Sequence, residues 1–230
     1  PRSTHTRSSA GQMCIRDRPA YTSIVGGGAN GCILHYIENK DMLKNGDLVL
    51  IDAGCEFEDY ASDITRTFPV NGKFSDEQAA IYDIVLKALK EAIDVTQAGT
   101  PYNKTNETTI RVITEGLVEL GLLKGDINDL IKAEAHREFY MHGAGHWLGL
   151  DVHDVGDYKI DGEWRIYEPG MVVTIEPGIY ISPKNKKVDT KWRGIGVRIE
   201  DDIVITKTGN INLTSKVPKE RNEIEKMMAK

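Results

Sequence analysis

The 230-residue sequence has few cysteines, no long apolar run and no excess of positive charge. Its three cysteines, Cys14, Cys32 and Cys55, are widely spaced and form no CxxC pair, which excludes a disulfide framework and a zinc or redox motif of that type. This cysteine usage is typical of a reducing compartment, so we expect a cytoplasmic protein. No apolar stretch approaches the length of a membrane span. The net charge of −6 argues against a nucleic-acid-binding protein, which needs a basic surface.

Residues 1–18 differ from the rest of the chain in composition. They contain four arginines and one acidic residue, and they lack the apolar core of a secretory signal. An Arg- and Ser-rich targeting peptide is one interpretation, but a disordered or artefactual lead is the simpler one. The chain also begins with proline, as expected of a fragment. The remaining residues, 19–230, are expected to form one domain.

The middle of the chain predicts helices, and both flanks predict strands. Ser75 and Gln78 form a capping-box pattern ahead of a helical apolar stripe, and Gly99 and Pro101 end that helix. Two more helices are predicted over residues 106–120 and 126–136. Strands are predicted at four apolar runs: Leu48–Ala53, Tyr60–Val70, Met171–Ile181 and Gly196–Thr206. Strands, then helices, then strands favour an α+β fold, with helices covering an antiparallel sheet.

Each of these four predicted strands contains an acidic residue within its apolar run. The residues are Asp52, Asp63, Glu176 and Glu200. A single acid in a strand usually faces water, because many antiparallel sheets are solvated on one side. That interpretation weakens when all four strands share the feature. We therefore treat the four carboxylates as candidates for one common site.

A hairpin with its turn near Phe57–Glu58 would place Asp52 directly opposite Asp63. Opposed carboxylates destabilise a sheet unless a cation lies between them. Glu176 and Glu200 can form a second pair from the later strands. Four acids exceed the needs of one divalent ion but suit two ions about 3.5–4 Å apart. Oxygen ligands with one imidazole favour Mn²⁺, with Co²⁺ or Zn²⁺ as alternatives.

The stretch HGAGHWLGLDVHD, residues 142–154, carries three of the six histidines. His142 and His146 are four residues apart, as in helical HExxH zinc sites, but no glutamate follows His142. Gly143 and Gly145 argue against a helix and favour an irregular loop that passes close to the site. A histidine in a loop is more often structural than catalytic, but its position beside four acids favours a functional role.

Several segments together carry a family resemblance: NGCILHY, LVLIDAGCEFEDYASDITRTFPVNGKF, HGAGHWLGLDVHD, EPGMVVTIEPGIYI and RGIGVRIEDDIVIT. From about Pro19 to near its C-terminus the chain closely resembles the catalytic domain of bacterial aminopeptidases P, which are Xaa-Pro aminopeptidases of the pita-bread metallopeptidase family. The resemblance implies a curved antiparallel sheet covered by helices, truncated here at its N-terminal edge. It also implies hydrolysis of the bond between an N-terminal residue and a following proline.

The resemblance implies a role for each candidate residue. Asp52 would bind one divalent ion, Asp63 and Glu200 would bridge two, and His146 and Glu176 would complete the second ion's site. The remaining groups would contact substrate or support the ligands. Glu176 would also accept a proton from water, His35 and His153 would stabilise the oxyanion, and His142 and Arg198 would support the cluster.

The family's separate N-terminal domain, which lines the substrate site, has no counterpart in this sequence. The resemblance implies peptide substrates with proline at the second position and a homo-oligomer in the full-length protein. Three alternatives stay open: a prolidase or methionine aminopeptidase of the same fold, a catalytically silent pita-bread binding protein, and an inactive fragment. Release of proline from a dipeptide and from a tripeptide would separate the prolidase from the aminopeptidase.

Overall fold

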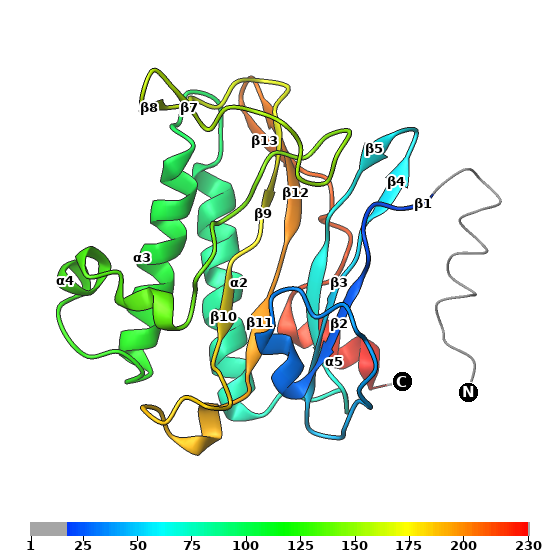
Figure 1. The fold of residues 1–230 in the computed structure, drawn as a ribbon, viewed down its shortest axis with the longest axis vertical. Helices are drawn as coiled ribbons and strands as arrows, with labels where there is room; N and C mark the ends of the chain where they lie inside the picture. Colours follow the sequence, from blue (N-terminus) through cyan, green and yellow to red (C-terminus); the bar gives the residue numbers. More distant parts are fainter. Residues whose placement is uncertain (1–17, 230) are drawn as a thin grey trace.

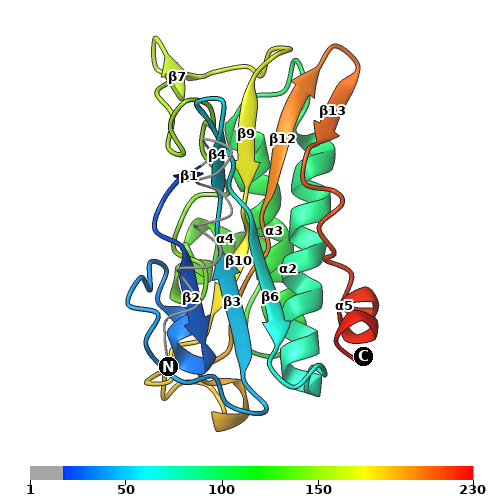
Figure 2. The ribbon, with the colours of Figure 1, turned by 90° about the vertical axis from the view of Figure 1, so that its right-hand side faces the viewer.

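The computed structural model describes residues 18–229 and has an α+β architecture with antiparallel strands throughout. Figures 1 and 2 show the two long helices α2 and α3 side by side on one face of strands β9 to β12. The sheet β2-β3-β6 lies on the other side of these strands, and β11 contacts both β3 and β6. The two groups of strands therefore meet along β11.

Three helices confirm the predicted order, and a fourth, at residues 221–228, was not predicted. They are α2 (Asp76–Val95), α3 (Asn103–Glu119), α4 (Ile127–Lys132) and α5 (Arg221–Met228), with 3-10 turns η1 (Gly28–Cys32), η2 (Ala135–Glu138) and η3 (Thr190–Trp192). The Ser75–Gln78 capping box is present at the start of α2. The predicted third helix ends early, at Lys132, because the chain turns through the left-handed residue Glu134 (φ 51°) and continues as η2. Helix α3 begins three residues earlier than expected.

Most strands are short. They are β1 (Arg18–Pro19), β2 (Ile24–Gly27), β3 (Leu48–Asp52), β4 (Cys55–Phe57), β5 (Tyr60–Ala61), β6 (Thr65–Pro69), β7 (Lys159–Ile160), β8 (Glu163–Trp164), β9 (Val172–Ile175), β10 (Gly178–Tyr180), β11 (Gly196–Arg198), β12 (Asp201–Thr206) and β13 (Gly209–Asn212). They pair in the orders β1-β4-β5, β2-β3-β6, β13-β12-β9, β10-β11 and β7-β8.

Each predicted strand is shorter than expected or divided, and the break lies at or beside its acid. β3 ends at Asp52, and the chain between β5 and β6 contains Asp63. The chain between β9 and β10 contains Glu176, and the chain between β11 and β12 contains Glu200. The register continues across these breaks, with Ile199 N donating to Pro177 O (3.3 Å) and Ala53 N to Ile64 O (3.0 Å), so the acids keep the face that the register gives them.

The predicted hairpin register is wrong by two residues. The turn lies at Glu58–Asp59, both with positive φ (49° and 71°), so Asp52 pairs with Thr65 and not with Asp63. A shift of two keeps Asp63 on the same face as Thr65, diagonal to Asp52. The two acids therefore still face one site, but they are not directly opposed.

One large buried cluster joins the helices to the strands. It contains Ile81, Val85 and Leu89 of α2 together with Ile175 of β9 and Ile179 of β10. The apolar stripe predicted for α2 is thus its buried face, and it fixes the strands on both sides of Glu176. Helical packing thereby determines where this acid lies.

The expected lead over residues 1–18 and the expected absence of a membrane span both concern residues that lie partly outside the described range. The separate lead over residues 1–18 lies there except for Arg18, which pairs with Glu56 in the ladder of β1 and β4. Within residues 18–229, no helix is both long and apolar enough to cross a membrane.

Candidate metal centre

The four strand acids converge on one pocket, as the sequence predicts. The pocket has a volume of about 210 Å³. It is lined by every candidate residue and one leucine: Leu34, His35, Asp52, Asp63, His142, His146, His153, Glu176, Arg198 and Glu200. The paired strands explain part of this convergence, because the register that pairs Ile175 with Asp201 also pairs Gly178 with Arg198. The same register, continued across the gap between the two ladders, places Glu176 opposite Glu200.

Three of these side chains form a compact ligand group. Potential ligand atoms of Asp63, His146 and Glu200 all lie within 4.8 Å of one another. The Nε2 atom of His146 is 3.5 Å from Oδ2 of Asp63 and 3.9 Å from Oε1 of Glu176. Two carboxylates and one imidazole at this spacing can hold a divalent cation.

The loop between η2 and β7 aims His146 at the acids. Main-chain hydrogen bonds run from Thr174 N to His146 O (2.9 Å) and from Glu176 N to Ala144 O (2.8 Å), so the loop extends the ladder of β9. Gly145 permits this approach, since a Cβ atom there would lie 1.9 Å from Thr174 O. The Nδ1 atom of His146 lies 2.9 Å from Trp147 O, which leaves Nε2 directed at the carboxylates.

The pocket carries more negative than positive charge. Its one guanidinium, Arg198, donates to Oδ2 of Asp52 at 2.6 Å. Burial raises the pKa of Asp52, of Glu176 to about 7, and of Glu200 well above its usual range. Neighbouring carboxylates add to the shift in each case. The pKa values rise because burial and like charge both disfavour the ionised form.

An unpartnered oxygen shows that a cation fits this charge distribution. Thr65 Oγ1 donates to Oε2 of Glu200 at 2.6 Å, but Oε1 of Glu200 is buried and has no hydrogen-bond partner within residues 18–229. A buried carboxylate oxygen without a partner is costly unless a cation or donor approaches it. The donor set of Asp52, Asp63, Glu176, Glu200 and His146 fits divalent ions on these grounds.

The other predicted residues also reach the pocket. His35 and His153 are exposed at its rim, and the His153 ring lies 4.4 Å from that of His146. His142 lies deeper, with Nε2 2.9 Å from Tyr180 Oη, and burial lowers its pKa to about 4. Tyr180 Oη also accepts from Nη1 of Arg198 at 3.1 Å.

Sequence reasoning missed three residues at this site. The hydroxyl of Tyr21, in the loop before β2, lies within hydrogen-bond distance of Asp52 and Asp63 and can donate to either of them. Thr65 holds Glu200, and Tyr180 joins His142 to Arg198. Tyr180 and Thr65 lie in runs that read as ordinary strands, and no local signal distinguishes Tyr21 from a packing tyrosine.

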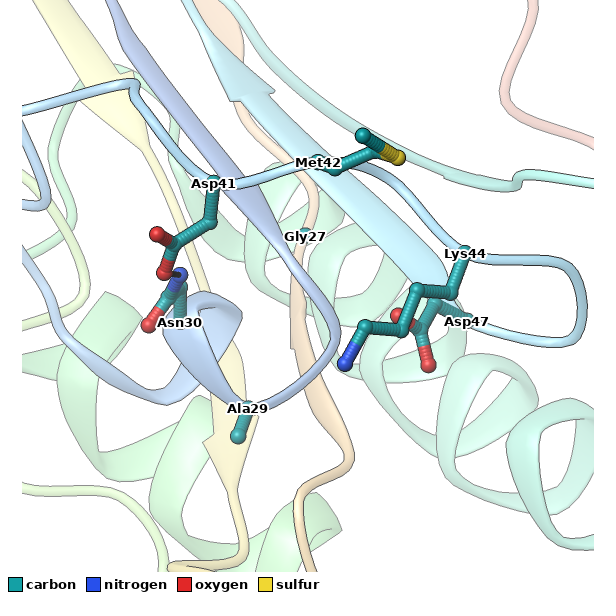
Figure 3. Close-up of a pocket in the computed structure, with 7 residues that line it drawn as sticks. All are labelled: Gly27, Ala29, Asn30, Asp41, Met42, Lys44 and Asp47. Atoms are coloured by element: carbon teal, nitrogen blue, oxygen red, sulfur yellow. Dashed lines mark hydrogen bonds between the residues drawn. The ribbon is translucent and has the colours of Figure 1, made fainter.

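A second hollow is larger but lacks converging chemical groups. Figure 3 shows this surface pocket of about 530 Å³ near η1, lined by small and mixed polar residues: Gly27, Ala29, Asn30, Asp41, Met42, Lys44 and Asp47. Asn30 Nδ2 donates to Asp41 Oδ2 at 2.7 Å, so these two side chains satisfy each other. None of the candidate residues lines it, and we assign it no chemistry.

Comparison with known proteins agrees with the geometry. Residues 5–207 match the model of metallopeptidase family M24. The chain is 58% identical over 210 residues to the Xaa-Pro aminopeptidase of Escherichia coli, covering 91% of this chain and 47% of that protein. It is 60% identical over 210 residues to the Xaa-Pro aminopeptidase of Haemophilus influenzae, covering 91% and 48%.

Solved structures show the same fold. An aminopeptidase of Pseudomonas aeruginosa superposes with a TM-score of 0.91 at 62% identity, covering 92% of this chain and 48% of that one. An aminopeptidase P of Yersinia pestis gives a TM-score of 0.89 at 60% identity, covering 92% and 48%. The expected pita-bread fold is thereby confirmed. The chain spans about half the length of the relatives it matches.

Proposed function

The chain belongs to metallopeptidase family M24, and from this we propose that the protein is a Xaa-Pro aminopeptidase that uses two divalent metal ions. The observation that carries the proposal is the pocket itself. Four carboxylates and His146 converge there around an unpartnered Glu200 oxygen. Relatives at 58–60% identity are named Xaa-Pro aminopeptidases, which supports the same reaction here.

Five side chains would hold the ions. Asp52 would serve one ion, Asp63 and Glu200 both, and His146 with Glu176 the other. Bound ions would lower the pKa of water and polarise the scissile carbonyl. The oxygen-rich donor set with one imidazole favours Mn²⁺ over softer metals.

Glu176 is proposed to accept the proton of the attacking water. Its side chain is 20% exposed, so it contacts both the buried acids and the open pocket. Burial raises its pKa to about 7 in the metal-free fold, so this carboxyl takes up a proton more readily than an ordinary glutamate. Its Oε2 lies 3.9 Å from Nδ1 of His142, whose lowered pKa keeps that imidazole neutral.

The exposed histidines are proposed to act on the substrate carbonyl. His153 and His35 stand at the pocket rim, where an N–H group can donate to the oxygen that gains charge during attack. The Xaa-Pro bond is a tertiary amide and has no N–H group. A peptidase that binds its substrate through the N–H of the scissile bond therefore cannot cleave it. Recognition through the carbonyl and the free amine avoids that requirement.

The proposal also covers the substrates, the assembly and the location of the protein. The substrates are peptides with proline at the second position, and the full-length protein forms a homo-oligomer. A cytoplasmic location is supported by Cys32 and Cys55, which are free thiols in the described part of the chain.

Metal analysis combined with a peptide assay tests the function. We expect the purified protein to bind two Mn²⁺ ions and to release the N-terminal residue from an Xaa-Pro tripeptide. Faster cleavage of a dipeptide than of a tripeptide would favour a prolidase. A protein that binds no divalent ion and cleaves neither peptide would contradict the proposal and favour a binding protein.

A further inference from the structure

Tyr21 lies in the loop between β1 and β2 and brings a hydroxyl into the carboxylate cluster. The loop is held to the β3–β4 segment by the hydrogen bond from Ala20 N to Gly54 O (3.1 Å). Gly54 also makes room for the ring, because a Cβ atom there would lie 2.8 Å from Tyr21 Cε1. The fold therefore places this phenol against the acids rather than leaving it in solvent.

The Tyr21 hydroxyl lies within hydrogen-bond distance of Oδ1 of Asp52 and Oδ1 of Asp63. A phenol has one proton, so it can donate to only one carboxylate at a time and is shared between the two. Without a donor between them, two nearby carboxylates repel each other and turn apart. The hydroxyl thus holds both carboxylates towards one point.

The two aspartates depend on this hydroxyl unequally. Both main chains are held, Asp52 in the β3 ladder and Asp63 through its N–H, which donates to Oδ2 of Asp202 at 3.2 Å, so the difference lies in the side chains. The other oxygen of Asp63 lies 3.5 Å from Nε2 of His146, within the ligand group. The Asp52 carboxylate has only one other hydrogen-bond donor in the described part of the chain, Arg198. Without the phenol, Arg198 would be the remaining donor to Asp52 and would hold this carboxylate away from Asp63.

We propose that Tyr21 is a positioning residue that keeps Asp52 aligned with Asp63, so that the ion bound through Asp52 depends on the Tyr21 hydroxyl. The proposal rests on the proposed two-ion function. Partners that orient ligating carboxylates typically change metal affinity by about 10- to 100-fold when they are removed. The effect falls on one ion because Asp63, His146 and Glu200 form a ligand group without Asp52.

Tyr21→Phe tests the proposal, with Tyr36→Phe as the matched control. Tyr36 is 4% exposed, and its hydroxyl has no hydrogen-bond partner within residues 18–229. The metal-free full chain is titrated with Mn²⁺ by calorimetry, and electron paramagnetic resonance reports whether two ions couple magnetically. Thermal melts in the presence of chelator check that each variant folds.

In Tyr21→Phe we expect the weaker dissociation constant for Mn²⁺ to rise about 10- to 100-fold. The tighter constant changes less than about threefold, and the coupled signal is lost at Mn²⁺ concentrations that saturate the unmodified protein. Tyr36→Phe keeps both constants and the signal. Unchanged binding in Tyr21→Phe, or equal weakening of both ions with a lowered melting temperature, would overturn the positioning role while leaving the two-ion function intact. If the unmodified protein itself does not bind two Mn²⁺ ions, both the proposed function and this inference fail.

Discussion

Carboxylates at the ends of apolar strands are the residues on which this site depends. Asp52, Asp63 and Glu200 are buried, and Glu176 is partly buried, although a carboxylate is almost never buried without a partner. Arg198 compensates part of their charge, and Thr65 and Tyr21 donate hydrogen bonds. Glu200 still keeps one oxygen without a partner. The remaining negative charge is what divalent ions would neutralise.

Asp63→Asn tests the bridging role at this scale. Asparagine keeps the shape of the side chain but removes the charge that two ions would share. We expect turnover of an Xaa-Pro peptide to fall more than about 100-fold, because loss of an orienting partner alone costs 10- to 100-fold. Asp59→Asn is the control, since Asp59 lies in an exposed turn at φ 71°, a conformation asparagine tolerates. Near-normal turnover in Asp63→Asn would contradict the assignment.

His153→Ala separates a substrate-binding histidine from a metal ligand. The ring is exposed and lies beside His146, outside the compact group of Asp63, His146 and Glu200. Loss of a donor to the oxyanion typically lowers turnover about 10²–10³-fold. We expect that loss with unchanged metal content, measured by elemental analysis of the purified variant. A variant that also loses metal would identify His153 as a ligand.

The residue types of the site were predictable from the sequence, but some of its partners were not. Charge inside apolar runs identifies Asp52, Asp63, Glu176 and Glu200 without any structure. Tyr21 could not be found in this way, because its role depends on a contact between residues 31 and 42 positions apart. A tyrosine in a polar loop has the same local pattern whether it packs or donates.

Three of the four acids lie at breaks between strands: Asp63 between β5 and β6, Glu176 between β9 and β10, and Glu200 between β11 and β12. Apolar runs predicted continuous strands over Met171–Ile181 and Gly196–Thr206, and the structure divides both. Pro177 follows Glu176 and cannot donate to a ladder, which explains the break between β9 and β10. The β11–β12 break faces this proline, because the same register sets Ile199 opposite Pro177. The sequence also did not predict the hairpin register. Its turn is formed by Glu58 and Asp59, two non-glycine residues with positive φ, and no glycine marks that position.

Gly145→Ala tests how the histidine loop is attached to β9. The added Cβ would lie 1.9 Å from Thr174 O, so the loop would have to move away from the strand and strain its two hydrogen bonds. We expect the free energy of unfolding to fall by at least about 1–3 kcal/mol and metal content to fall with it. Urea unfolding and elemental analysis measure both.

Gly143→Ala is the matched control for this substitution. Among residues 18–229, only Gly145 O, at 4.0 Å, lies within reach of a Cβ atom at position 143. We expect its stability and metal content to stay close to those of the unmodified protein. Equal effects of the two substitutions would mean that general loop stiffness, rather than contact with β9, positions His146.

At the scale of the whole molecule, the candidate metal centre lies where two groups of strands meet. Asp52 and Asp63 come from the β3–β6 region, whereas Glu176 and Glu200 come from strands packed on α2. The meeting line brings like charges together, and burial raises the pKa of Asp52, Glu176 and Glu200. The metal-free fold is therefore destabilised by the same convergence that would bind ions.

This convergence predicts how pH changes the stabilisation by Mn²⁺. An acid with a raised pKa in the folded state stabilises the metal-free fold below its unfolded pKa, and that stability is lost as pH rises through the folded value. For Glu176 the window runs from 4.5 to about 7. An ion must displace these protons, so the rise in melting temperature caused by Mn²⁺ should be larger at pH 8 than at pH 6.

Each proton displaced changes the Mn²⁺ stabilisation by about 1.4 kcal/mol per pH unit, and about 1 kcal/mol corresponds to roughly 2–4 °C in a chain of this size. Melting curves with Mn²⁺ and with chelator, taken at each pH, give the difference directly. Groups remote from the centre, such as His136, whose pKa burial lowers, affect both curves equally and cancel. Asp63→Asn should reduce the Mn²⁺ shift at every pH. A Mn²⁺ shift that stays constant between pH 6 and pH 8 would mean that the ion displaces no protons, and the buried carboxylates would then not be its ligands.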